Sequence, residues 1–252
     1  MMQTGYSTTN GIKKAQNQDA LIIKKGRTEI GEILFMAVCD GMGGLSSGEL
    51  ASTETVNLIS DWFDIAIEDL VKLGITDQEI ISSLTPVIEE ANTRLYRYGE
   101  ENSIQCGTTI SGVLLYNNRY ATINVGDSRI YKLTNIKIEQ LTHDQTLVQQ
   151  LIDEGEITPE EAETHKKRST LTQCIGVSDD VSPVFTFGSY QDGDVFLACS
   201  DGFRHKLKED EIFKLYSPQE MPKIDQDRID FGITCNTARQ ETDNISVVIC
   251  KT

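Results

Sequence analysis

The sequence predicts an α+β sandwich, a fold in which helices cover stacked β-sheets. Two long helical segments follow each other between residue 47 and about residue 98, and strand-like runs flank them on both sides in the chain. Strands grouped around adjacent helices favour separate layers over an alternating βαβ arrangement. Short acidic or glycine-rich motifs are spread from residue 17 to residue 244, so any cut would separate them. We therefore expect residues 1–252 to form a single domain.

Apolar and alternating runs predict the strands. The run at residues 33–39 is nearly all apolar, so we expect both of its faces to be buried. Asn117 and Asn118, which lie between two such runs, are typical of a hairpin turn. The predicted strands are residues 20–25, 33–39, 108–116, 120–125, 129–133, 136–141, 184–187, 194–199 and 245–250.

Helical periodicity predicts the covering layers. After a glycine-rich turn at residues 41–44, apolar side chains recur at steps of three and four in residues 47–71. Thr76 and Asp77 can cap the next helix, which we expect Pro86 to interrupt. Shorter helices are expected at residues 145–154, from residue 158 onward, and at 208–216 and 224–239.

The composition excludes several classes of protein. The formal net charge of −16 argues against nucleic acid and anionic membrane as primary partners. The longest apolar runs are far shorter than the roughly 20 residues that span a bilayer. Residues 1–5 lack the charged and apolar regions of a secretory signal, and the six cysteines include no Cys-x-x-Cys pair. We therefore expect a cytoplasmic protein without a zinc site.

Aspartates stand where apolar strand-like runs end. Asp40, Asp127 and Asp201 each follow such a run directly or within two residues. A strand end holds its carboxylate on a rigid element, and several such ends brought together would form a carboxylate cluster. Carboxylates a few ångströms apart can all stay ionised only around divalent cations. An oxygen-rich ligand set of this kind suits Mg²⁺ or Mn²⁺.

The motifs occur in a fixed order that carries more information than any of them alone. Asp-Gly by itself is a common turn pair, but here each motif lies at its expected place relative to the strands. The motifs are Asn17-Gln18-Asp19, Asp40-Gly41-Met42-Gly43-Gly44, Gly107-Thr108-Thr109, Gly126-Asp127-Ser128-Arg129, Ser200-Asp201-Gly202 and Asp243-Asn244. In order and spelling they resemble the metal-dependent serine/threonine protein phosphatases of type 2C, in their bacterial form. The resemblance extends from about Gly5 to Ile249.

This resemblance implies a fold and a reaction. The fold is a four-layer α-β-β-α sandwich with two mainly antiparallel sheets and the metal site at one end. The reaction is hydrolysis of phosphoserine and phosphothreonine in proteins by a water or hydroxide that bridges two Mn²⁺ or Mg²⁺ ions. Residues 155–180 correspond to the family's variable flap, which tunes substrate access. The flap's basic cluster, His165-Lys166-Lys167-Arg168, either attracts an anionic phosphopeptide or only keeps a surface helix soluble.

The resemblance also implies roles for particular residues. Asp40 bridges the two ions, and the carbonyl of Gly41 supplies another oxygen ligand. Asp201 and Asp243 match the other aspartates that bind the metal directly. Asp19 matches a residue that holds metal-bound water, so the expected catalytic set is Asp40, Asp201, Asp243 and Asp19.

Other positions are supporting residues or departures from the family. Asn244 should brace the loop of the last motif. Asp127 matches a ligand of a third, weaker ion, although Asp in Gly-Asp-Ser is also a good turn residue. Lys14, with Lys13 beside it, replaces the arginine that commonly binds the substrate phosphate, and it offers a point charge rather than a planar fork. An ordinary solvated loop is the alternative for both lysines. Met42 stands where many eukaryotic members have a histidine proposed as general acid, so the proton donor stays unassigned.

The sequence favours an active protein phosphatase and leaves two other classes open. A non-catalytic relative would keep the fold as a binding or regulatory module, and Lys14 is the one sequence feature in its favour. A metal-dependent phosphatase of small molecules is the third class. The partners expected from the family are phosphoprotein substrates and a serine/threonine protein kinase, and we expect the chain to be a monomer.

Overall fold

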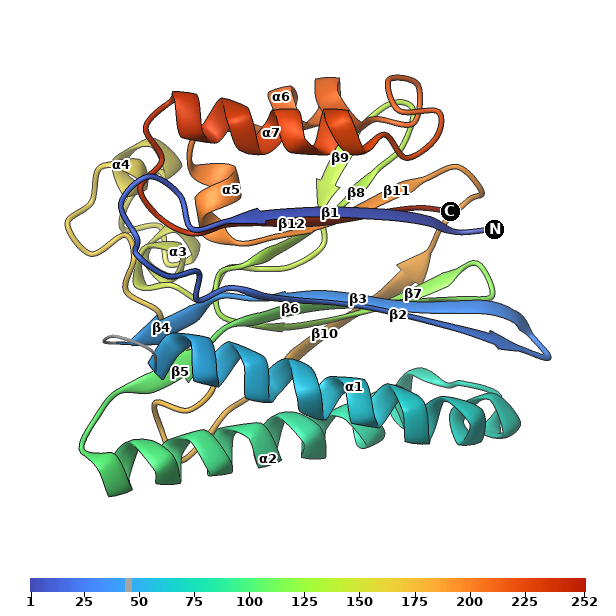
Figure 1. The fold of residues 1–252 in the computed structure, drawn as a ribbon, viewed down its shortest axis with the longest axis horizontal. Coiled ribbons are helices and arrows are strands. Elements are labelled where there is room, and N and C mark those ends of the chain that lie inside the picture. The colour runs from blue at the N-terminus through green and yellow to red at the C-terminus, as the bar shows by residue number, and fades with distance from the viewer. Residues whose placement is uncertain (44–46) are drawn as a thin grey trace.

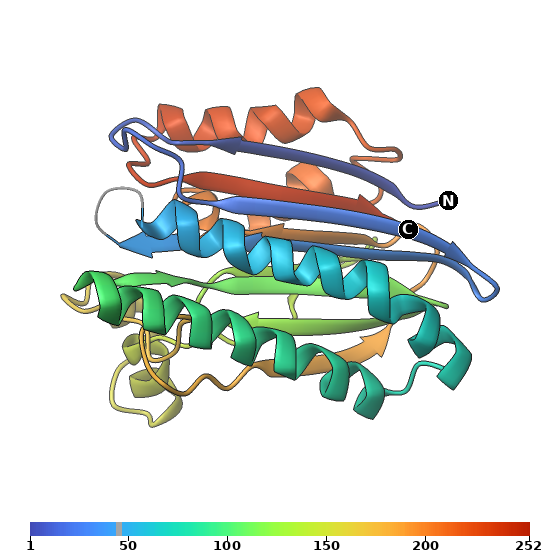
Figure 2. The ribbon, with the colours of Figure 1, turned by 60° about the horizontal axis from the view of Figure 1, so that its bottom comes forward.

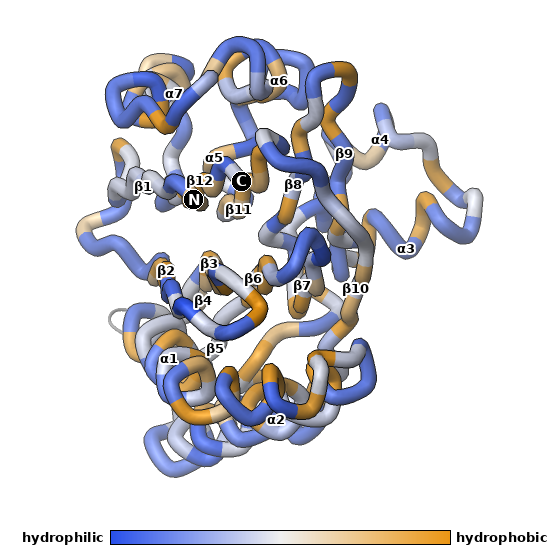
Figure 3. The backbone as a smooth tube through the Cα atoms, turned by 90° about the vertical axis from the view of Figure 1, so that its right-hand side faces the viewer, coloured by the Kyte–Doolittle hydropathy of each residue, from blue (hydrophilic) through white to orange (hydrophobic). Residues whose placement is uncertain are grey.

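The computed structural model describes residues 1–43 and 47–252 and shows four layers, with helices on the outside and two sheets between them (Figure 1). One outer layer consists of α1 (Ser47–Leu73) and α2 (Asp77–Asn102), and the other contains α6 (Glu209–Tyr216) and α7 (Gln226–Ala238). The end-on view of Figure 3 shows the sheets stacked between these layers. The predicted four-layer sandwich is confirmed. Gly44 of the predicted glycine turn lies outside the described residues.

Each of the two large sheets has five antiparallel strands. Strand order is β1-β12-β11-β8-β9 in one sheet and β10-β7-β6-β3-β2 in the other, and a short β4-β5 pair lies beside them. Because β1 pairs with β12, the first and last strands of the chain are neighbours. The strands are β1 (Gln3–Thr9), β2 (Ala20–Thr28), β3 (Gly31–Cys39), β4 (Gly41–Gly43), β5 (Cys106–Thr108), β6 (Ile110–Tyr116), β7 (Arg119–Val125), β8 (Arg129–Leu133), β9 (Ile138–Gln140), β10 (Val184–Ser189), β11 (Val195–Cys199) and β12 (Ile245–Lys251).

Alternation along the strands divides the core into three parts. In β3 the odd-numbered residues 33–39 pack toward α1 and α2, whereas the even-numbered residues 34–38 pack between the sheets. In β12 the odd-numbered residues 245–249 face the other helical layer, and Val248 and Cys250 face the space between the sheets. Adjacent side chains point to opposite faces of a strand, so a strand between two cores is apolar throughout. The predicted burial of both faces of residues 33–39 is confirmed.

The helix α2 runs through Pro86 without a break, so the predicted interruption is wrong. A capping box between Thr76 and Glu79 starts the helix as expected. Proline removes one backbone hydrogen bond from a helix interior, but burial of apolar side chains on both sides keeps this helix in place. The buried side chains that flank Pro86 are Ile80, Leu84, Ile88 and Ala91. Figure 2 shows α1 and α2 side by side over the second sheet.

Other differences from the predicted elements occur near motifs. The predicted strand 108–116 is divided at Thr109, whose amide donates to the carbonyl of Asp40 rather than to a strand neighbour. The strand β1, the strand β4 and the five-residue helix α5 (Asp201–His205) were not predicted. The hairpin turn is confirmed, because Asn117 and Asn118 both have positive φ values, 42° and 59°.

The fold brings the motif-bearing strand ends to one end of the sandwich. The end of β3, the end of β11 and the start of β12 lie on the left in Figure 1, beside α3 (Leu147–Asp153) and α4 (Pro159–Glu163). None of the described helices combines the length and the apolar character that a bilayer crossing requires.

Replacing Pro86 tests the account of α2. The substitution Pro86→Ala restores an amide that can bond within the helix, so we expect an increase in the free energy of unfolding of about 1–3 kcal/mol. Urea unfolding followed by circular dichroism measures it. Pro222→Ala, in an exposed loop, is the control and should stay within about 0.5 kcal/mol of the wild type. A destabilised Pro86→Ala variant would show that the proline fits this helix better than alanine.

Candidate functional site

Carboxylates from distant parts of the chain converge at this end of the sandwich. Asp19 precedes β2, Asp40 follows β3, Asp201 begins α5 and Asp243 precedes β12. Burial raises the pKa of the Asp40 carboxyl well above its usual range, and the charges of Asp19, Asp201, Asp127 and Asp243 raise it further. Mutual repulsion of this kind requires the groups to be near one another. The structure therefore brings together all the aspartates singled out in the sequence.

Several oxygens of this carboxylate cluster are buried without a partner. Burial raises the pKa of Asp19 to about 7; the hydroxyls of Ser246 and Ser200 oppose this shift, and the charges of Asp201 and Asp243 add to it. Among the described residues, no hydrogen bond of normal geometry reaches either carboxylate oxygen of Asp19, or Oδ1 of Asp201. Buried polar atoms are ordinarily satisfied, so these oxygens are suited to a cation.

The ligand set is open rather than closed. Among residues 1–43 and 47–252, no group of three or more carboxylate, imidazole or thiol side chains is arranged so that it could hold a metal ion by itself. Ions such as Mg²⁺ take one or two carboxylates from a protein and keep several waters. The donor set of this site, with aspartates and the neighbouring Gly41 carbonyl, fits ions of that type.

The Gly107-Thr108-Thr109 motif holds the backbone of Asp40. The Asp40 amide donates to Thr109 Oγ1 at 3.0 Å, and its carbonyl accepts from the Thr109 amide at 2.9 Å and from Thr108 Oγ1 at 3.0 Å. The sequence contained this motif, but nothing in its pattern showed what it contacts. These bonds fix the main chain at the end of β3, so the Asp40 carboxylate has a defined position.

Gly41 lies where two other parts of the backbone approach closely. It is buried, and its amide donates to the carbonyl of Gln18 at 3.2 Å. A Cβ atom at this position would collide with the carbonyl oxygens of Gly48 and Gln18. Only glycine allows the chain that follows Asp40 to pass between α1 and the loop before β2.

Asn244 and Lys14 connect the first loop of the chain to the last motif. The buried Asn244 side chain accepts from the Gln18 amide at 3.0 Å and donates to the carbonyl of Gln16 at 3.1 Å. Lys14 Nζ lies 2.9 Å from Asp243 Oδ1. Burial lowers the pKa of Lys14, but the hydrogen bond and charge of Asp243 outweigh it and leave this pKa raised. The lysine is therefore a cation at the edge of the carboxylate cluster.

Asp127 belongs to an ion-pair network that sequence reasoning missed. Arg204 Nη2 lies 3.3 Å from Asp127 Oδ2 and 3.2 Å from Asp144 Oδ2. Arg129 binds Asp144 with two parallel bonds, from Nε at 2.8 Å and from Nη2 at 2.7 Å. Burial raises the pKa of Asp127 to about 7, and the charge of Asp201 raises it further while Arg204 lowers it. The four charges link β8, α5, the loop after β7 and the loop between β9 and α3.

His205 also contacts the carboxylate cluster, and no sequence motif pointed to it. Its Nε2 lies 3.3 Å from Asp201 Oδ2, and its Nδ1 lies 3.5 Å from Glu241 Oε2. Burial lowers the pKa of His205, but the hydrogen bond to Glu241 and the charge of Asp201 leave it raised overall. Arg204 and His205 follow Asp201 by three and four residues, one helical turn. Recognition of α5 in the sequence would have placed both beside Asp201.

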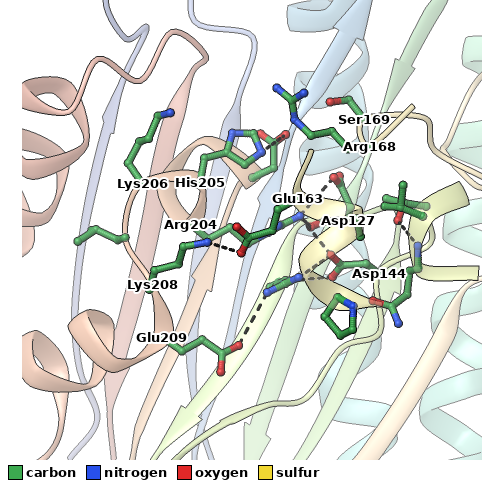
Figure 4. A pocket seen from close by; sticks show the side chains of 18 of the residues that line it. Asp127, Asp144, Glu163, Arg168, Ser169, Arg204, His205, Lys206, Lys208 and Glu209 are labelled. Carbon is green, nitrogen blue, oxygen red and sulfur yellow. Dashed lines mark hydrogen bonds and ion pairs between the residues drawn. The ribbon is translucent and has the colours of Figure 1, made fainter. Parts of the chain in front are cut away.

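A cleft of about 1060 Å³ extends from the cluster to the predicted flap (Figure 4). Asp127, Asp201 and Asp243 of the carboxylate cluster line it, and so do Glu163 and Arg168 of the flap segment. Glu163 on α4 and Lys208 before α6 form an ion pair of 2.6 Å. The flap segment thus borders the site as expected, and Arg168 is the member of the predicted basic cluster that faces the cleft.

Solved structures of known phosphatases share this architecture. The S. agalactiae serine/threonine phosphatase is similar with a TM-score of 0.85 at 29% sequence identity, covering 100% of both chains. The catalytic domain of the serine/threonine protein phosphatase PstP, in complex with two manganese ions, is similar with a TM-score of 0.78 at 25% identity, covering 99% of this chain and 97% of that one. The fold is that of a serine/threonine phosphatase.

Sequence comparison gives the family. The protein phosphatase 2C model matches residues 8–228. The protein phosphatase PhpP of Streptococcus pneumoniae is 32% identical over 216 residues, which cover 84% of this chain and 82% of that protein. The chain belongs to the protein phosphatase 2C family, as its motifs indicated.

A methyl group at Gly41 should disturb this end of the sandwich. In Gly41→Ala the new Cβ must displace backbone carbonyls, so we expect a loss of about 1–3 kcal/mol in the free energy of unfolding. Gly26→Ala is the matched control, because its new Cβ would meet only Phe63 ring carbons at 3.7 Å. Urea unfolding of both variants measures the difference. Equal stability of the two variants would contradict the close approach at Gly41.

Proposed function

We propose that this protein is a Mg²⁺- or Mn²⁺-dependent phosphatase that hydrolyses phosphoserine and phosphothreonine in proteins. The convergence of Asp19, Asp40, Asp201 and Asp243 at one end of a phosphatase 2C fold carries this proposal. Relatives such as PhpP are named protein phosphatases, which supports phosphoproteins as substrates. A serine/threonine protein kinase as partner, a cytoplasmic location and a single-domain monomer belong to the same proposal.

Different residues of the site would bind the metal ions, orient water and fix the backbone. Asp40, Asp201, Asp243 and the Gly41 carbonyl would hold two ions, and Asp19 would orient water beside them. When bound, such ions lower the pKa of water toward neutrality and offset the charge on the phosphoryl oxygens. The hydrogen bonds between the Asp40 backbone and Thr108 and Thr109 keep this backbone rigid, so the Asp40 carboxylate needs little reorganisation to act as a ligand.

Lys14 would bind the substrate phosphate. Its position 2.9 Å from Asp243 puts its charge at the cluster and supports this role over that of a solvated loop residue. An ammonium group has three donors, so a contact with Asp243 leaves others for phosphate oxygens. Compared with an arginine fork, the lysine fixes the orientation of the phosphate less firmly.

The alternative is a non-catalytic module that binds partners through the same fold. The four aspartates expected to act in catalysis are all present and lie together, which favours an enzyme. Hydrolysis of p-nitrophenyl phosphate with Mn²⁺, abolished by a chelator, would distinguish the two functions. Comparison of phosphopeptides with phosphorylated metabolites would then separate a protein phosphatase from a small-molecule phosphatase.

Asp40→Asn tests the central ligand. The amide keeps the size of the side chain and removes the charge that would hold two cations. Mutation of residues that only hydrogen-bond to a metal ligand typically lowers metal affinity or activity by about 10–100-fold. Loss of a ligand itself should cost more, so we expect kcat to fall more than ~100-fold at limiting Mn²⁺. Asp61→Asn, on the exposed surface of α1, is the control. Near wild-type turnover of Asp40→Asn would overturn the proposed ligand set.

Lys14→Ala tests the phosphate contact. A charged hydrogen bond to the transition state contributes about 1.5–3 kcal/mol, so kcat/KM should fall accordingly. Lys14→Arg should keep or improve activity, because it restores a planar fork. Lys13→Ala, one residue away, is the control. Unchanged kcat/KM in Lys14→Ala would show that Lys14 is an ordinary solvated loop residue and does not bind the phosphate.

A further inference from the structure

The contacts of Arg204 place a fixed cation beside the carboxylate cluster. Its side chain is 15% exposed, and it donates from Nη2 to the Asp127 carbonyl at 2.9 Å as well as to the Asp127 carboxylate at 3.3 Å. The same nitrogen lies 3.2 Å from Asp144. Figure 4 shows Arg204 between these two aspartates. The Nη2 atom of Arg204 thus contacts both aspartates, and the guanidinium lies in a largely buried position.

Two guanidinium groups and two largely buried carboxylates form the centre of the network around Arg204. The guanidinium groups of Arg204 and Arg129 face the carboxylates of Asp127 and Asp144, and Arg129 also lies 3.8 Å from the exposed Glu209. Arg129 already satisfies Asp144 with two bonds. Arg204 is therefore the cation that compensates Asp127. Without it, the Asp127 carboxylate would lie unpaired in the field of Asp201.

We propose that Arg204 takes the place of a third metal ion in this protein and keeps Asp127 from binding one. A divalent cation on Asp127 would compete with the guanidinium for the same carboxylate and would lie beside a like charge. Arg204 cannot lose its proton, so it supplies this positive charge at every metal concentration. The inference rests on the proposed two-ion phosphatase, and it gives Arg204 the role of a positioning residue.

It follows that two bound metal ions should be enough for full activity. The resemblance to the family predicts a weak third ion at Asp127, whereas the contacts of Arg204 predict that turnover saturates when the first two sites are filled. The fixed guanidinium holds Asp127 against α5, whose first residue is Asp201. Removal of Arg204 should free Asp127 and create a third, weaker site.

Counting bound Mn²⁺ tests the proposal without relying on activity. Isothermal titration calorimetry of the full chain should find two ions per wild-type molecule, and the same number in Asp127→Asn. Arg204→Gln should bind a third ion, and Arg204→Gln combined with Asp127→Asn should return to two. Arg119→Gln, which breaks an exposed ion pair with Asp77, is the control and should stay at two.

The outcomes separate this inference from the proposed function. A third ion in the wild type that disappears in Asp127→Asn would overturn the role of Arg204 and leave the phosphatase intact. A chain that binds no Mn²⁺ would overturn the proposed function itself. Should Arg204→Gln fail to fold, the comparison of wild type with Asp127→Asn still decides, because it needs no change at Arg204.

Discussion

Repulsion among clustered carboxylates is the constraint on which this structure depends. Asp19, Asp127, Asp201 and Asp243 all oppose ionisation of Asp40, and burial strengthens that opposition. Such an arrangement persists only where the surrounding fold fixes each group more strongly than repulsion separates them. The sandwich does this with strand ends that are packed on both faces and with hydrogen bonds between the Asp40 backbone and Thr108 and Thr109.

Much of the fold was predictable, because the faces of a helix or strand that are buried determine how apolar residues are spaced along the sequence. Residues 33–39 are apolar without alternation, and in the structure they contact two different cores. The turn at Asn117 and Asn118 followed from local chemistry, since asparagine tolerates positive φ. The aspartates of the site were found for a related reason: each stands where a predicted strand stops or starts, and the sandwich gathers those positions at one end.

The remaining features depend on contacts that no local pattern records. Pro86 is a helix breaker in isolation, but α2 is stabilised by packing on both sides of it. The helix α5 has five residues, too few to show a helical period, so Arg204 and His205 were not recognised as neighbours of Asp201. Arg204 pairs with Asp127 across 77 positions of sequence, and a single sequence gives no sign of such a pair.

The pairing of β1 with β12 has a consequence for the order of folding. The side chain of Asn244 accepts a hydrogen bond from the amide of Gln18, 226 positions away in the sequence. Lys14 forms an ion pair with Asp243 and so joins the same two segments. The chain loses conformational entropy when it closes so long a loop, and this loss comes before the contacts form, which slows folding. A nascent chain that ends before residue 243 lacks both Asp243 and β12. The carboxylate cluster is therefore incomplete until β12 has been synthesised and has paired with β1.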